Sequence, residues 1–215
     1  HILETNTTKI NKKISLTSKE YNVPKEVLNA LKILDNQAKK LREKRMKDGA
    51  ISFDRLEVKF ELNKKNKPEK IYFKKSRDAN KLVEEFMLFA NKKVATFISK
   101  KHNFPSIYRV HDKPDEEKLY NFKKTIETLG YAFKPKNNKT NVTINNLLKE
   151  CNGKKEQNLI ETLALRSMSK AEYTTENIGH YGLAFTNYTH FTSPIRRYPD
   201  IVVHRILQNY LSNEK

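Results

Sequence analysis

Residues 179–205 read GHYGLAFTNYTHFTSPIRRYPDIVVHR, and this stretch differs from the rest of the chain in composition. The chain has 43 Lys and Arg and is dominated by lysine, but no lysine lies between Lys170 and Lys215. The cations inside that span are Arg196, Arg197 and Arg205. Two of the five glycines and three of the six histidines also fall in the stretch. This local composition indicates that particular side chains are needed here.

The segment TSPIRRYPD favours a helix start beside two arginines. One possibility is that Thr192 or Ser193 caps a helix that begins at the following proline. The other is that the helix begins near Pro199, because a residue before proline is pushed out of the α conformation, so Arg196 and Arg197 lie in a turn before the helix. Both place guanidinium groups beside backbone N–H groups that bind anions. A planar guanidinium matches phosphate oxygens, whereas lysine offers a point charge.

Aromatic rings surround these arginines and could stack on nucleic-acid bases. The alternation of apolar residues in YGLAF (181–185) predicts a short strand with one buried face. The ring-bearing candidates are Tyr181, Tyr188, His190, Phe191 and Tyr198.

Outward from this stretch, the spacing of apolar residues predicts an α+β fold, with helices packed on a small, mostly antiparallel sheet. The chain contains no linker long enough to force two domains, so we expect residues 1–215 to form a single segment. Residues 56–62 alternate apolar with charged side chains, as a half-buried strand does. Helices are expected at 24–47, 78–100, 114–129, 143–150 and 155–168, strands at 56–62, 71–73 and 107–110, and polar loops at 7–20 and 134–141.

The net charge of +18 and the sequence pI of about 9.8 attract polyanions, and nucleic acid is the first candidate. A protein-interaction domain whose charge reflects gene composition is the plainer alternative. The single cysteine, Cys151, excludes an internal disulfide and fits a reducing compartment such as the cytoplasm. No apolar run is long enough to span a membrane, so no membrane association is expected. Because the chain begins with His1, we expect it to start after processing, after a tag or inside a longer protein.

Two upstream segments offer further polar candidates. In residues 76–98, Glu84 and Asn91 are seven apart and share one helix face, while Glu85 follows Lys81 by four. In YRVHDKPDEE (108–117), Arg109 and His111 alternate at a strand end and could face a cleft. The acids at 115–117 suit the first turn of a helix better than a metal site, because helical spacing spreads them apart.

The motifs just described resemble those of the RNB catalytic domain of the ribonuclease II/ribonuclease R family. RSMSKAEYTTENIGHYGLAFTNYTHFTSPIRRYPDIVVHR (166–205) matches the C-terminal part of that domain, and the HFTSPIRRYPD signature (190–200) is highly specific. The segments at 49–60, 78–91 and 108–119 agree in order and spacing. The RRYPD form and the HDKP loop are closer to ribonuclease R than to ribonuclease II.

The resemblance implies a processive 3′→5′ exoribonuclease that releases nucleoside 5′-monophosphates from single-stranded RNA. It implies that Arg196 holds the scissile phosphate and stabilises charge developing on it. One of Glu84 and Glu85 would contact the sugar of the 3′-terminal nucleotide, and Glu84 is favoured because it shares a face with Asn91. The other residues assigned to RNA binding are Arg197, Tyr198, Asn91, Arg109, His111 and His190.

This chain departs from the family pattern in its acidic residues. The family binds Mg²⁺ through closely spaced aspartates in the N-terminal half of the domain, and no such cluster occurs here. We therefore expect the chain to be the C-terminal part of the domain and to hold no metal by itself. Its expected partners are single-stranded RNA and the remainder of the same polypeptide, namely the upstream half of the RNB domain and OB-fold domains. The alternative is a basic RNA-binding module without catalysis.

Overall fold

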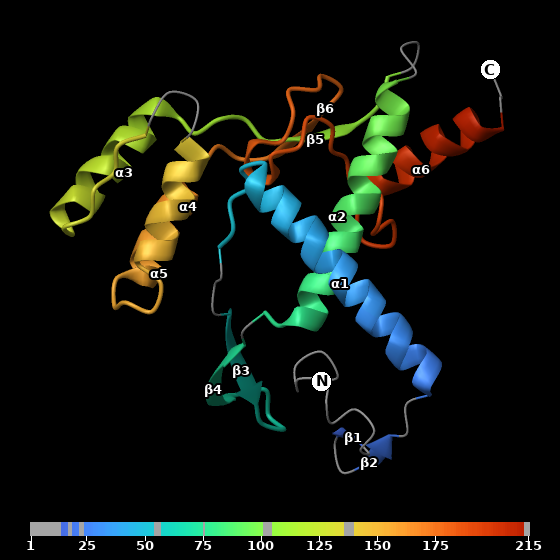
Figure 1. Cartoon of the computed structure of the whole chain (residues 1–215), viewed down its shortest axis with the longest axis horizontal. Coiled ribbons are helices and arrows are strands. Elements are labelled where there is room, and N and C mark those ends of the chain that lie inside the picture. Colours follow the sequence, from blue (N-terminus) through green and yellow to red (C-terminus); the bar gives the residue numbers. More distant parts are fainter. Residues whose placement is uncertain are drawn as a thin grey trace. The chain divides into compact units, whose positions relative to one another are not determined.

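The computed structural model describes residues 14–16, 19–21, 24–53, 57–74, 76–100, 105–135 and 140–212 (Figure 1). The chain divides into two compact units, one made of His1–Glu43 with Asp54–Phe86 and the other of Lys44–Phe53 with Met87–Lys215. Two long helices, α1 (Lys25–Lys47) and α2 (Asp78–Ser99), each contribute residues to both units. Both helices lie where the apolar spacing predicts them.

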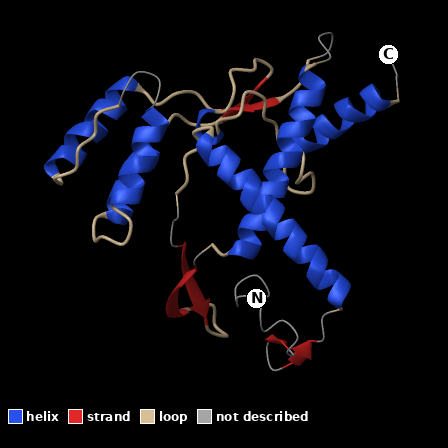
Figure 2. Cartoon of the chain, viewed as in Figure 1, coloured by secondary structure: helices blue, strands red, loops and turns tan. Residues whose placement is uncertain are grey.

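The first unit contains two antiparallel hairpins, drawn as red strands in Figure 2. The hairpin of β1 (Ile14–Leu16) and β2 (Lys19–Tyr21) corrects the prediction of a loop over 7–20. The hairpin of β3 (Glu57–Leu62) and β4 (Pro68–Lys74) confirms the two predicted strands. The prediction that the apolar face of β3 is buried is wrong: Val58, Phe60 and Leu62 are 50%, 55% and 53% exposed.

In the first unit, charged side chains connect α1 to α2. The Lys39 ammonium lies 2.7 Å from a carboxylate oxygen of Asp35 on the same helix and 3.6 Å from one of Asp78 on α2. One turn further along, Arg42 lies 3.9 Å from the Glu85 carboxylate. Of these groups Glu85 is the most buried, at 3% exposed, so its ion pair contributes more to the contact than an exposed pair would.

Three helices of the second unit enclose an apolar core: α3 (Glu116–Thr128), α4 (Thr140–Glu150) and α5 (Gln157–Ser167). Figure 1 shows α3 beside the α4–α5 pair. Phe122 and Phe133 meet edge to face with ring centroids 5.1 Å apart. Asp115 caps α3 by accepting a hydrogen bond from the Lys118 N–H at 3.0 Å. The acidic run at 115–117 therefore starts a helix, as its position in the sequence predicts.

The second unit also contains the antiparallel pair β5 (Tyr108–Val110) and β6 (Glu172–Thr174), of which β6 was not predicted. Among the described residues the strands form three separate two-stranded sheets. The predicted strand at 181–185 is instead a 3₁₀ turn, η2 (Tyr181–Leu183). Ala184 follows η2 in the left-handed region at φ 54°, which returns the chain so that Phe185 pairs with His180. The α+β class is confirmed.

Candidate nucleic-acid interface

Asn91 of α2 holds the start of the segment that carries the arginines. Its side-chain oxygen accepts hydrogen bonds from the backbone N–H of Phe191 at 3.0 Å and of Thr192 at 3.2 Å. Its amide nitrogen donates to the hydroxyl of Tyr188 at 3.2 Å. Asn91 is 3% exposed, so these bonds replace water that the backbone would otherwise need. The geometry favours a positioning role for Asn91, and direct contact with RNA stays a prediction.

Asp200 is the second residue that holds this segment, and it connects the segment to the helix that follows. It is fully buried in the first turn of α6 (Tyr198–Leu211), and its Oδ1 accepts from the Ser193 N–H at 2.7 Å and from Arg197 Nη2 at 2.8 Å. The helix begins at Tyr198, not at the first proline, so the second of the two expected arrangements is confirmed. Arg196 and Arg197 precede the helix, and Arg197 occupies its N-cap position.

The two neighbouring arginines therefore have different surroundings. The Arg197 side chain is 17% exposed and paired with Asp200. Arg196 is exposed, and its Nη2 makes one long hydrogen bond, 3.4 Å, to the Ser193 hydroxyl. Ile195 beside it is fully exposed, and Tyr198 is 70% exposed. The fold thus turns Arg197 inward and leaves Arg196 and Tyr198 exposed.

The β5–β6 pair adds a third guanidinium. Arg109 pairs in register with Tyr173, and its guanidinium carbon lies 4.6 Å from the centroid of the Tyr173 ring, which is a cation–π contact. The Tyr173 hydroxyl lies 2.6 Å from Nδ1 of His190, whose ring meets the Tyr173 ring edge to face at 5.6 Å. Arg109 is therefore connected through one tyrosine to the arginine-bearing segment.

The electrostatics of His190 indicate that the three arginines lie around it. Burial is the main cause that lowers the pKa of His190 from 6.5 to about 4, and the positive charge of Arg197 is the next. Arg109 and Arg196 lower the pKa further, while the carboxylate of Asp200 acts in the opposite direction. Several positive charges around a neutral imidazole form an environment that favours an anion.

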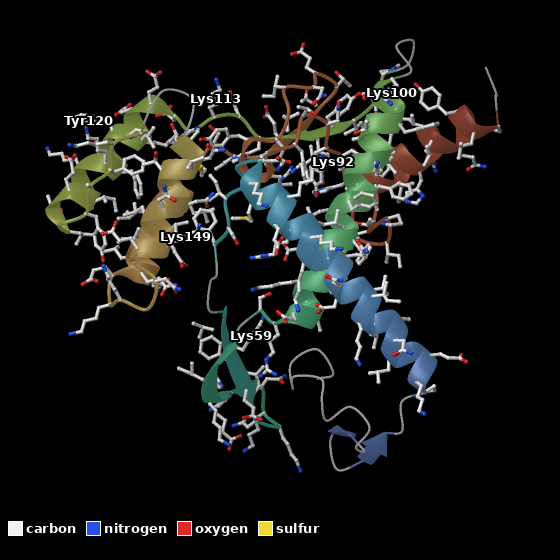
Figure 3. All side chains as sticks on the ribbon, in the orientation of Figure 1. Lys59, Lys92, Lys100, Lys113, Tyr120 and Lys149 are labelled. Atoms are coloured by element: carbon white, nitrogen blue, oxygen red, sulfur yellow. The ribbon has the colours of Figure 1, made fainter. Side chains whose placement is uncertain are left out.

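Lysine adds to this positive surface from α2. Lys92, labelled in Figure 3, lies next to Asn91 in sequence and places its ammonium 4.6 Å from the centroid of the Phe185 ring. Phe185 packs against Tyr188 with ring centroids 5.7 Å apart. The aromatic residues of the segment therefore form a connected cluster with cations at its edge.

His111 is engaged within the fold through both ring nitrogens. Its Nδ1 accepts from the Gly182 N–H at 2.9 Å, and its Nε2 lies 2.9 Å from the Ser169 carbonyl oxygen, to which it donates. A Cβ on residue 182 would lie 3.0 Å from the His111 Nδ1, so glycine permits this close approach. His111 joins β5 to η2, and its assignment to the RNA path stays a prediction.

The sequence-predicted site residues fall into two groups. The second unit contains Asn91, His111 and Tyr198 and brings together Arg109, His190, Arg196 and Arg197. Glu84 and Glu85 belong to the first unit, where Glu84 is exposed and Glu85 is buried beside Arg42.

Sequence reasoning missed Tyr173 and Asp200. Asp200 could have been found, because it follows Arg197 by three residues, a spacing at which helical side chains meet. Tyr173 left no such signal, because the strand that carries it is three residues long and polar at both ends.

We expect Asn91→Ala to lower the free energy of unfolding by about 2 to 3 kcal/mol, because two backbone donors and the Tyr188 hydroxyl lose their partner. The matched control is Asn145→Ala, which removes a single partly buried hydrogen bond to the Ala50 carbonyl and should cost about 1 kcal/mol. Urea denaturation followed by circular dichroism measures both. Equal losses in the two variants would contradict the anchoring role of Asn91.

Comparison with known proteins places this architecture in one class. The RNB domain family matches residues 2–213 of the chain. The chain therefore belongs to the RNB domain family.

Within this family the chain is similar to ribonuclease R. It is 38% identical over 189 residues to ribonuclease R of Aquifex aeolicus (strain VF5), covering 88% of this chain and 27% of that protein. It is 39% identical over 190 residues to ribonuclease R of Escherichia coli (strain K12), covering 88% of this chain and 22% of that protein. A solved structure of Mycoplasma genitalium RNase R in complex with ribose methylated single-stranded RNA matches with a TM-score of 0.81 and 31% identity, covering 90% of this chain and 30% of that one. The chain thus spans about a quarter of the length of these curated relatives.

Proposed function

We propose that this chain forms part of a 3′→5′ exoribonuclease that degrades single-stranded RNA processively to nucleoside 5′-monophosphates. The observation that carries the proposal is the presentation of Arg196 at a turn anchored by Asn91 and Asp200, inside a chain of the RNB domain family. The structural relative solved with single-stranded RNA supports RNA as the ligand.

In this function Arg196 contacts the scissile phosphate and stabilises the charge that develops on it during hydrolysis. Arg197 supports this arginine by fixing the turn through Asp200. Arg109 and His190 add positive charge and a polar ring near the phosphate path, and the exposed ring of Tyr198 is available for stacking on a base. One of Glu84 and Glu85 accepts a hydrogen bond from the sugar of the terminal nucleotide, and a 2′-OH there selects RNA over DNA.

The family implies Mg²⁺, and the described residues do not fit it. Nowhere in the described part of the chain do three or more His, Cys, Asp or Glu side chains converge in a way that could hold a metal ion. Asp200 is fully buried and its Oδ1 is bound by Arg197 and a backbone N–H, and Glu85 lies beside Arg42. Oxygen ligands for Mg²⁺ would therefore come from other parts of the polypeptide.

We propose a cytoplasmic protein without membrane attachment. Cys151 is a buried free thiol, and burial raises its pKa, which suits a reducing compartment and gives the thiol little reactivity. Of the helices that the structure describes, none has the length and apolar character needed to cross a bilayer.

The isolated chain should bind single-stranded RNA with strong salt dependence and should not degrade it. Neutralising three or four phosphates predicts that log K falls with log salt at a slope of roughly −2 to −3. Fluorescence anisotropy of a labelled oligouridylate across a salt series measures the slope, and chromatography of the products with Mg²⁺ present detects mononucleotides. Affinity independent of salt would contradict phosphate binding, and released mononucleotides would refute the inactivity of the isolated chain.

The second candidate function is an RNA-binding module without catalysis, which the net charge of +18 supports. An assay of the full-length protein distinguishes the two candidate functions. The exoribonuclease releases nucleoside 5′-monophosphates from oligouridylate in the presence of Mg²⁺, whereas the binding module retains the RNA intact.

A further inference from the structure

Tyr173 lies between two candidate RNA-binding residues and touches both. Its ring faces the Arg109 guanidinium at 4.6 Å, and its hydroxyl is 2.6 Å from His190 Nδ1. The two contacts use different parts of the tyrosine, the ring face for the cation and the hydroxyl for the imidazole. Nothing in the amino-acid pattern or in the family motif around residues 190–200 points to this tyrosine.

The short hydrogen bond has one favoured direction. The surroundings of His190 favour the neutral imidazole, because burial and nearby guanidinium groups disfavour a second proton on the ring. A neutral imidazole has one N–H and one unprotonated nitrogen. The unprotonated nitrogen is much more basic than a phenol oxygen, so the Tyr173 O–H donates to Nδ1. The cation over the ring draws electron density from the phenol and strengthens it as a donor.

The proton of the imidazole then lies on Nε2. The hydrogen bond at one ring nitrogen sets the protonation of the other, as it does in histidines that bind metals or act in catalysis. Within the described part of the chain, the His190 ring makes one hydrogen bond, and its partner is Tyr173. The neighbouring Tyr188 contacts the same ring edge to face at 5.7 Å, while its own hydroxyl accepts from Asn91. The Nε2–H is therefore left for a ligand.

We propose that Tyr173 is a positioning residue that fixes His190 in the Nε2–H tautomer, so that His190 donates a neutral hydrogen bond to an RNA phosphate bound by Arg109 and Arg196. The same tyrosine holds the Arg109 guanidinium on its ring face, so one side chain orients two residues that bind the phosphate, Arg109 and His190. This inference rests on the proposed function, because it assigns a phosphate as the acceptor.

Tyr173→Phe is the sharpest test, because it keeps the ring under Arg109 and removes only the hydroxyl. Nitrogen-15 NMR of the histidine-labelled chain at neutral pH reports the tautomer of His190, and anisotropy with an oligouridylate reports affinity. We expect the wild-type ring to be the Nε2–H tautomer, and Tyr173→Phe to give a mixture of tautomers and a twofold to tenfold weaker affinity, as the loss of one hydrogen bond predicts. Tyr120→Phe, at an exposed tyrosine of α3 labelled in Figure 3, is the matched control and should change neither quantity.

A second pair of variants tests directly whether His190 donates a hydrogen bond from the position of Nε2. In His190→Gln the amide N–H₂ can reach the position of Nε2, whereas in His190→Asn the shorter side chain reaches only that of Nδ1. We expect glutamine to retain more of the RNA affinity than asparagine does. Equal losses of RNA affinity in the two variants would show that His190 acts through packing, and would overturn its role as a hydrogen-bond donor.

The outcomes separate this inference from the proposed function. An Nδ1–H tautomer in the wild-type chain, or an unchanged tautomer and affinity in Tyr173→Phe, overturns the role of Tyr173 while RNA binding stands. Absence of oligouridylate binding by the wild-type chain overturns the proposed function, and the phosphate-donor role of His190 falls with it, whatever the tautomer.

Discussion

Replacing Arg196 with alanine is expected to lower the single-turnover rate of RNA cleavage by the full-length enzyme about 10²–10³-fold. The guanidinium is exposed at an anchored turn. There it is available to stabilise the negative charge that grows on a phosphate in the transition state. Binding of RNA should weaken much less, because Arg109, His190 and many lysines are expected to contribute to ground-state affinity. Rapid-quench assays at saturating enzyme, with anisotropy for affinity, measure the two effects separately.

Two variants sharpen this test. Arg205→Ala removes an exposed arginine from α6 and should leave the cleavage rate unchanged. Arg196→Lys keeps the charge but loses the planar fork, so its rate should lie between those of the wild type and of Arg196→Ala. A sharp loss of affinity with normal single-turnover cleavage in Arg196→Ala would show that this arginine binds RNA without acting in the transition state.

Asp200→Ala should lower the free energy of unfolding by about 3 to 5 kcal/mol, because it leaves the largely buried Arg197 guanidinium without its partner and also removes the acceptor of the Ser193 N–H. Urea denaturation of the isolated chain measures this loss. The RNA affinity of the folded fraction should fall too, since the turn that presents Arg196 loses one of its two anchors.

The control is Glu127→Ala, which breaks an exposed pair with Lys123 at 3.9 Å and should change stability little. A second comparison replaces both partners, Arg197 by Met and Asp200 by Leu, and should recover much of the lost stability while RNA binding stays weak. Losses of similar size in Asp200→Ala and Glu127→Ala would contradict the buried pair.

Most of the helices could be predicted from the sequence because they depend on local signals. Apolar residues at helical spacing, with Gly49 and Gly130 just beyond the ends, are enough to place α1 and α3 to within about two residues. The turn η2 could not be predicted this way, because its conformation depends on the ring of His111, which lies 71 residues away from Gly182 in sequence.

The chemical character of the candidate site could be predicted from the sequence, but the separate roles of its residues could not. The change from lysine to arginine identified Arg196 and Arg197 as a pair, and only the burial of Asp200 separates the exposed arginine from the structural one. Tyr173 is placed beside Arg109 by the register of β5 with β6. This register joins residues 64 positions apart in the chain, so no local sequence signal predicts it.

The anchoring of the arginine-bearing turn by Asn91 and Asp200 affects the free-energy cost of binding RNA. Both anchors act on backbone N–H groups at or before Ser193, so the order of the segment is acquired when the chain folds rather than when RNA arrives. The conformational entropy is then already lost before association, and more of the contact energy appears as affinity. Ile195 and Arg196 at the tip make no anchoring contact through their side chains beyond one long hydrogen bond, so ligand preference can be altered there while the fold is kept.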